Sequence, residues 1–236
     1  VARDPAVEAA KLIHLGSGAA RDGWAVPVTY GEALDRGLAS DVPTLTGITA
    51  DDYGPPADQM RTTVASFARE LPAMFGVNRE AFVARDEAFF ALCPVATDRE
   101  AREIAKRTQI EYRLASIAHW ATRRARTAKT PVYTYIFDHA VDPERGAWHG
   151  ADLAYAFNAP DEKGRPWTET DRRVADVVSS YWVNFVKTGD PNGGGLPEWS
   201  PFSEGRPATM ALGPTPASRP IATAERMEFY KALLGK

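Results

Sequence analysis

The chain has 236 residues, 44% of them hydrophobic and 25% charged, which is the composition of an ordinary globular protein with one large domain or two small ones. Its net charge of −3 and pI of about 5.9 indicate neither a nucleic-acid partner nor binding to a membrane surface. No apolar run approaches the ~18 residues that a membrane span needs. The single cysteine, Cys93, excludes an internal disulfide and a multi-cysteine metal site, and its position at the end of an apolar segment indicates a buried, inert thiol.

The first part of the chain predicts two short helices and a buried strand. Apolar residues at helical spacing, ended each time by glycine, indicate helices at 4–15 and 30–38. Residues 42–49 are apolar and rich in β-branched side chains, which predicts a strand. The acidic turn after this strand contains Asp51 and Asp52. Because sites in open α/β sheets are built at the carboxyl ends of strands, this turn is a candidate site segment.

Residues 57–127 are expected to be mostly helical. Apolar side chains recur at steps of three or four in three helices, expected at 57–75, 78–92 and 97–127. Thr97 and Glu100 have the spacing of a capping box at the start of the last one. His119 on this helix, like His14 earlier in the chain, is expected to be a packed or surface histidine. The phenylalanines of the region are expected in the core: Phe67, Phe75, Phe82, Phe89 and Phe90.

The second half of the chain predicts further strands and two helices. Strands are expected at 131–138 and 208–212, and helices at 169–187, where Thr168 and Asp171 form a cap, and at 223–234. His139 follows the first of these strands and is a candidate support residue. Strands that carry an acid and a base in their following loops, amid many helices, predict an α/β fold with a mainly parallel sheet.

His149 is the candidate for proton transfer, because it lies between Gly146 and Gly150 in the loop after the strand at 131–138. A loop histidine with only local hydrogen bonds is the alternative interpretation. Asp52 precedes His149 in the chain, which agrees with the Ser, acid, His order of α/β-hydrolase triads. In such a triad the acid accepts a hydrogen bond from Nδ1–H of the histidine and fixes its tautomer.

The nucleophile of such a triad is missing from the sequence. A nucleophile elbow needs Gly-x-Ser-x-Gly, and no such pentapeptide occurs. Gly16-Ser17-Gly18 has the wrong spacing and is better explained as a linker, and Ser179 and Ser180 lie inside a predicted helix. The residues therefore supply a base and its orienting acid without a serine.

Other chemistries have less support. The sequence has neither a Walker loop nor a dinucleotide fingerprint, so we expect no cofactor. Its four histidines are scattered without metal-ligand spacing, and Asp51-Asp52 is better explained as an acidic turn than as a metal-binding pair.

Several segments together resemble the type-B carboxylesterases, the cholinesterase-like α/β-hydrolases. The sequence Gly-Ala-Trp-His-Gly-Ala-Asp-Leu-Ala-Tyr-Ala-Phe at 146–157 resembles the segment that carries the catalytic histidine of this family. Residues 180–192 and 195–199 resemble another family signature, 22–27 resemble an Asp-Gly…Pro segment, and 42–52 resemble the strand and loop of the triad acid. Their order and spacing agree across nearly the whole chain.

The resemblance implies a fold and roles for individual residues. Residues 1–236 would form the C-terminal half of one α/β-hydrolase domain, with 57–127 as a helical region covering the active site. His149 would be the general base and acid, and Asp52 the triad acid where the family usually has Glu. Because Asp is one methylene shorter, Asp51 is an alternative acid. Asp152 would support the site from behind, and Trp182 and Asn184 would have packing and capping roles.

The resemblance also implies partners. In this family the oxyanion loop and the serine elbow lie in the N-terminal half, so we expect this chain to work with an N-terminal part that supplies the serine. The expected reaction is hydrolysis of a small-molecule carboxylic ester. A non-catalytic binding or adhesion module of the same family, or an inactive fragment, is the alternative. The compartment is left open; a secreted or periplasmic location is among those that the resemblance allows.

Overall fold

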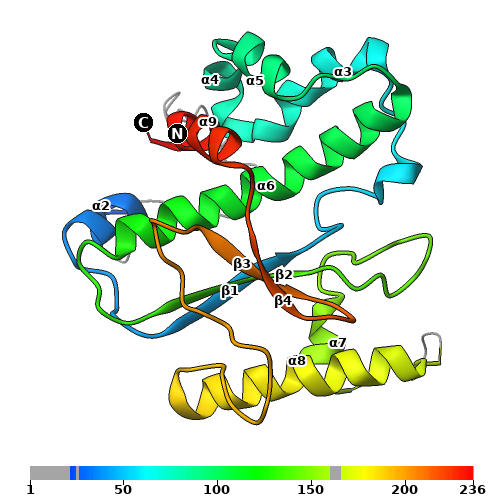
Figure 1. Cartoon of the computed structure of the whole chain (residues 1–236). Coiled ribbons are helices and arrows are strands. Elements are labelled where there is room, and N and C mark those ends of the chain that lie inside the picture. Colours follow the sequence, from blue (N-terminus) through cyan, green and yellow to red (C-terminus); the bar gives the residue numbers. More distant parts are fainter. Residues whose placement is uncertain (1–21, 25–26, 160–165, 236) are drawn as a thin grey trace, which may run out of the picture.

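The computed structural model describes residues 22–24, 27–159 and 166–235 (Figure 1). The helix expected at 4–15, with His14 and the Gly16-Ser17-Gly18 segment, lies outside these residues. Within the described part of the chain, no helix is both long and apolar enough to span a bilayer.

A four-stranded sheet forms the centre of the structure, as expected for a mainly parallel α/β fold. The strands follow one another in the order β1 (Thr44–Thr49), β2 (Val132–Phe137), β3 (Ala208–Leu212) and β4 (Ala217–Pro220). β1, β2 and β3 are parallel, and β4 returns antiparallel to β3. The sequence did not predict β4, because its four residues are all exposed and have no apolar alternation.

Helices cover both faces of the sheet. Among the described residues, the α-helices with eight residues or more are α6 (Asp98–Arg124), α8 (Glu169–Thr188) and α9 (Ala224–Leu234). In Figure 1 α6 crosses one face and α8 lies along the other. Successive side chains of a strand point to opposite faces. Accordingly Ile136 of β2 belongs to the core beneath α6, whereas Phe137 belongs to the core above α8.

The region between β1 and α6 differs from the expected pair of long helices. It consists of short elements: η1 (Ala57–Gln59), α3 (Val64–Glu70), η2 (Leu71–Asn78), α4 (Arg79–Val83) and α5 (Asp86–Leu92). Met60 is extended, so the chain leaves the first turn before Thr63 caps α3. Pro72 then begins a new turn, and Gly76 at φ +53° breaks the helical path. Phe75 and Phe82 nevertheless stack in the core at 4.1 Å, as predicted for these aromatics.

Capping boxes begin the two longest helices, as the sequence predicted. The N–H of Glu100 donates to the Thr97 hydroxyl at 3.2 Å, and the N–H of Thr97 donates to the Glu100 carboxylate at 2.9 Å. Thr168 and Asp171 form the same reciprocal pair at the start of α8, at 3.1 and 2.7 Å. Each box satisfies backbone donors that helix geometry leaves without a partner.

A buried ion pair joins α6 to α9. Nε of Arg226 donates to the Glu111 carboxylate at 2.6 Å, and the Tyr230 hydroxyl donates to the same carboxylate oxygen at 3.0 Å. Cys93 contacts the same guanidinium. Burial raises the pKa of the Cys93 thiol, so this cysteine is a protonated core residue, as expected.

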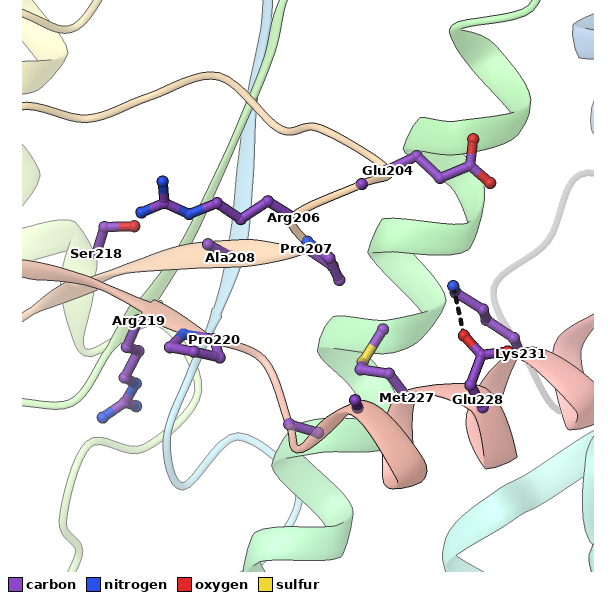
Figure 2. Close-up of a pocket in the computed structure, with 13 residues that line it drawn as sticks. Glu204, Arg206, Pro207, Ala208, Ser218, Arg219, Pro220, Met227, Glu228 and Lys231 are labelled. Atoms are coloured by element: carbon purple, nitrogen blue, oxygen red, sulfur yellow. Dashed lines mark hydrogen bonds and ion pairs between the residues drawn. The ribbon is translucent and has the colours of Figure 1, made fainter.

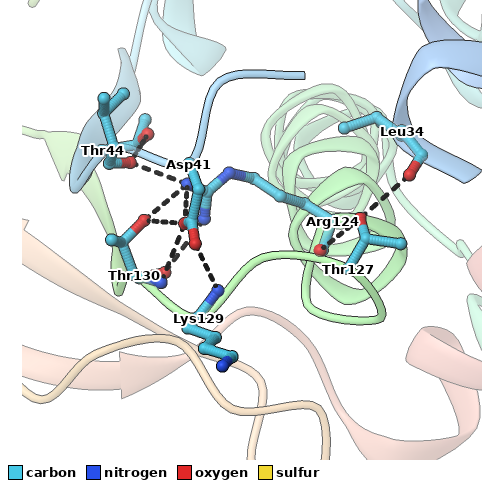
Figure 3. Close-up of polar contacts among 8 residues, drawn as sticks. Leu34, Asp41, Thr44, Arg124, Thr127, Lys129 and Thr130 are labelled. Atoms are coloured by element: carbon cyan, nitrogen blue, oxygen red, sulfur yellow. Dashed lines mark hydrogen bonds and ion pairs between the residues drawn. The ribbon is translucent and has the colours of Figure 1, made fainter. Parts of the chain in front are cut away.

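Arg124 and Asp41 organise the end of the sheet where β1 and β2 begin (Figure 3). The buried Arg124 guanidinium donates to the carbonyl oxygens of Val42, at 2.7 Å, and Thr130, at 2.9 Å. Asp41 accepts the backbone N–H groups of Lys129 and Thr130, each at 3.0 Å. The segments that lead into the two strands are thereby held against each other and against the end of α6.

Asp41 is expected to make the fold sensitive to acid. Hydrogen bonds from the Thr130 hydroxyl and then from the N–H groups of Lys129 and Thr130 lower the pKa of Asp41 from 3.8 to about 2. Because this pKa is depressed in the folded state, the stabilisation is complete above pH 3.8 and is lost as the pH falls through 2. Urea unfolding across this window should show a flatter pH dependence for Asp41→Asn. Parallel curves for the two proteins would contradict the assignment.

Candidate active site

The structure brings His149 and Asp52 together, although 96 residues separate them in the chain. Asp52 lies in the turn after β1, and His149 lies in the loop that follows β2. Nδ1 of His149 forms a hydrogen bond with Oδ1 of Asp52. Since a carboxylate only accepts hydrogen bonds, this contact assigns the proton to Nδ1. The His149 side chain is 88% exposed, the Asp52 side chain is 11% exposed, and Nε2 has no partner among the described residues.

Asp51 has a different set of contacts from its neighbour. Oδ1 of Asp51 forms an ion pair with Nζ of Lys106 at 2.8 Å. Its Oδ2 accepts the N–H of Ala147 at 2.7 Å, and the N–H of Asp51 donates to the Ala147 carbonyl at 2.9 Å. Thus Asp52, and not Asp51, contacts His149 in this structure. Asp51 instead connects the turn after β1 (residues 50–54, the acid turn) to the loop that follows β2 and carries His149 (residues 138–151, the histidine loop).

Gly146 allows this connection. It has φ +61°, in the left-handed region that favours glycine, and a Cβ at this position would collide with the Asp51 carboxylate and the Pro56 ring. The loop can therefore approach Asp51 closely only because residue 146 has no side chain.

A tyrosine and a second acid lie behind the pair. The Tyr135 hydroxyl donates to Oδ2 of the buried Asp152 at 2.8 Å. Burial, and then the charges of Asp152 and Asp52, raise the pKa of Tyr135, so the hydroxyl keeps its proton and remains a donor. The sequence analysis gives Asp152 a supporting role behind the site. It gives no role to Tyr135, which occupies an ordinary position in an aromatic strand.

His139 stays apart from His149. Its Nε2 bonds with Oδ1 of the fully buried Asp171 at 2.7 Å, and the Tyr155 hydroxyl donates to the same oxygen at 2.8 Å. Asp171 is also the partner of Thr168 in the cap of α8. These contacts fasten the start of the histidine loop to α8, in keeping with a support residue.

Trp182 has the packing contact expected of it, whereas Asn184 bonds to the segment after α8, and the left-handed Gly189 caps that helix. Trp182 packs edge-on against Tyr135 at 5.2 Å. The Asn184 amide donates to the Pro191 carbonyl at 3.1 Å, just beyond the end of α8.

Two cavities flank the His149–Asp52 pair. A cavity of about 230 Å³ is lined by His149 and Asp52, together with Tyr135 and Asp152. A second cavity, of about 450 Å³, is lined mainly by aromatic and apolar side chains, among them Trp148. Gly150 and Leu153 line both cavities, so the two spaces adjoin.

A third cavity lies elsewhere, between the β3–β4 hairpin and α9 (Figure 2). It has a volume of about 430 Å³, and its wall includes Arg206, Arg219 and an ion pair between Glu228 and Lys231 at 2.8 Å. Neither His149 nor Asp52 lines it. Across the described ranges, no group of three or more His, Cys, Asp or Glu side chains has the arrangement of a metal site.

Comparison with known proteins gives a family for the chain. The sequence model described as the carboxylesterase family matches residues 18–230. Human cocaine esterase is 25% identical over 239 aligned residues, which cover 90% of this chain and 41% of that protein. Carboxylesterase 1C of Rattus norvegicus is 23% identical over 96% of this chain and 44% of its own length. Bile salt-activated lipase of Rattus norvegicus is 30% identical over an alignment that covers 60% of this chain and 23% of that protein. The chain thus spans less than half the length of these relatives.

Alanine at residue 146 is expected to destabilise the protein more than alanine at Gly194. Both glycines have nearly the same φ, +61° and +60°, but a Cβ at Gly194 meets nothing within 4 Å. The backbone penalty of about 1–2 kcal/mol should be common to both variants. Gly146→Ala should lose about 1–3 kcal/mol more, because its methyl group overpacks the Asp51 contact. Urea unfolding measures the difference in the free energy of unfolding. Equal losses in the two variants would mean that the loop accommodates the methyl group at residue 146 without further destabilisation.

Proposed function

Because this chain belongs to the carboxylesterase family, we propose that it is the part of a serine carboxylic ester hydrolase that supplies the histidine and the acid of the triad. His149 is the general base and acid, and Asp52 is the acid that orients it. The observation that carries the proposal is the geometry of His149. Its Nδ1 is bonded to a largely buried carboxylate, while its Nε2 is exposed and, within the described part of the chain, has no partner.

The proposed mechanism is acyl transfer. Nε2 of His149 removes the proton from a serine hydroxyl as the hydroxyl oxygen attacks the ester carbonyl carbon. The imidazolium so formed is stabilised by Asp52, and it then protonates the leaving alcohol. Water repeats the cycle on the acyl-enzyme and releases the acid. Asp52 remains ionised throughout and holds the ring in the tautomer that keeps Nε2 free to accept the proton.

The serine is proposed to come from a segment outside this sequence, the N-terminal part of the enzyme. The sequence has no Gly-x-Ser-x-Gly elbow, and the hydroxyl of Ser180 donates to the Asp176 carbonyl inside α8 at 2.6 Å. The outer edge of β1 also has no paired strand among the described residues. An edge strand presents a row of unpaired N–H and C=O groups that can pair with a further strand. Further parallel strands added beyond β1 would end at the same end of the sheet as β1 and β2, and a serine after one of them would lie on the side of the sheet where His149 and Asp52 are.

The proposed substrate is a small-molecule ester. The aromatic cavity of about 450 Å³ beside the pair has Trp148, Leu153 and Trp167 in its wall, which suits an apolar acyl or alcohol group. No step of this mechanism requires a cofactor.

Replacing either residue in the enzyme that contains this chain and its serine segment should nearly abolish turnover. We expect His149→Ala and Asp52→Asn each to lower kcat by about 10⁴-fold or more, since members of a concerted relay act as a unit. Hydrolysis of a chromogenic short-chain ester measures the loss.

His119→Ala is the matched control, because His119 lies on α6 and lines neither of the cavities beside the pair. Unchanged turnover in His149→Ala would exclude the mechanism. A complete enzyme that lacked esterase activity altogether would favour the non-catalytic binding module.

A further inference from the structure

We propose that Lys106 of α6 is a positioning residue for the His149–Asp52 pair. Acting through Asp51, it fixes the acid turn at the distance from the histidine loop that the short Asp52 side chain needs. The catalytic consequence rests on the proposed function, whereas the structural connection does not.

The Lys106 ammonium contacts the acid turn at two points. Nζ lies 2.8 Å from Oδ1 of Asp51 and donates to the Gly54 carbonyl at 2.9 Å. The side chains of Lys106 and Asp51 are only 9% and 11% exposed, so water screens the pair weakly. Two contacts from one ammonium group, to positions three residues apart, hold the turn against a rigid helix of 27 residues.

Asp51 passes this constraint to the histidine loop. Its carboxylate accepts the N–H of Ala147 at 2.7 Å, and its own N–H donates to the Ala147 carbonyl at 2.9 Å. Both backbone groups of Ala147 are thus bonded to one residue. Asp52 is the next residue after Asp51, and His149 is two residues beyond Ala147. The positions of the two paired side chains therefore follow from this one set of hydrogen bonds.

A purely stabilising role explains the ion pair less well. Burying two charges removes their hydration, so such a pair adds little net stability compared with apolar residues of similar size. The main effect of the ion pair is on the positions of the acid turn and the histidine loop. Without Lys106, Asp51 would be an unpaired carboxylate beside Asp52, free to leave Ala147 for water or to compete for the imidazolium of His149. Since aspartate has a single methylene, Asp52 has little reach with which to follow a displaced loop.

The first experiment compares Lys106→Met with Glu111→Gln in the complete enzyme. Both residues lie on α6 and belong to buried ion pairs, but Glu111 pairs with Arg226, away from the two loops. Lys106→Met should lower kcat by about 10- to 100-fold with KM nearly unchanged, because displacement of about 1 Å at a reacting centre costs that much. Glu111→Gln should lose stability and keep its kcat per folded molecule. Lys106→Gln, which keeps a donor without the charge, replaces Lys106→Met if that variant does not fold.

The second experiment needs no substrate. Amide hydrogen exchange of Ala147 should become at least about tenfold faster in the Lys106 variant, because opening of this loop exposes its N–H. The exchange rate of the Ala50 amide should be unchanged, because this amide donates to the Phe137 carbonyl within the extended ladder at 2.8 Å.

In the kinetic experiment, an unchanged kcat of the Lys106 variant, or a loss of kcat no larger than that of Glu111→Gln, would overturn the proposal.

An unchanged exchange rate of the Ala147 amide in the Lys106 variant would overturn the proposed role of Lys106, whatever the esterase activity of that variant. Faster exchange at Ala147 in a complete enzyme without esterase activity would refute the proposed function and leave the structural role of Lys106 standing.

Discussion

Parallel pairing of β1 with β2 is the constraint on which the candidate site depends. The pairing runs in register from Thr44 opposite Val132 to Thr49 opposite Phe137, and the Ala50 N–H extends it by one hydrogen bond. Because parallel strands end at the same edge of a sheet, the turn after β1 and the loop after β2 must emerge side by side. The ladder resumes beyond the strands, where Asp51 bridges to Trp148. The residues between Phe137 and Trp148 form an excursion that returns His149 to the edge beside Asp52.

α6 supports this end of the sheet from one of its two faces (Figure 1). Among its buried charged side chains, Lys106 holds the acid turn and Glu111 holds Arg226 of α9. At the other end of the same helix, Arg124 holds the segments that lead into β1 and β2. One helix thus contacts both ends of the parallel pair, so the strands and the loops at their carboxyl ends share a single rigid support. A buried pair of this kind adds little net stability compared with apolar residues of similar size.

Features that depend on local sequence could be predicted, and those that depend on distant contacts could not. The caps at Thr97 and Thr168, the buried strands and the helices α6 and α8 follow from spacing within a few residues. The breaks at Met60 and Gly76 interrupt an apolar period that by itself indicates continuous helix. Asp51 and Asp52 are alike in sequence, and their contacts differ because Lys106, 55 positions away, pairs with one of them. Likewise nothing near Tyr135 in the sequence indicates its hydrogen bond to Asp152.

The most direct test is a crystal structure of this chain together with its proposed serine segment, with a phosphonate ester bound covalently to the nucleophile. We predict a phosphonylated serine, from a segment outside this sequence, with its Oγ within hydrogen-bond distance of Nε2 of His149. Asp52 should still be hydrogen-bonded to Nδ1 of the same ring, and Asp51 should still form its ion pair with Lys106. A phosphonylated residue whose neighbouring base is any group other than His149 would contradict the central claim.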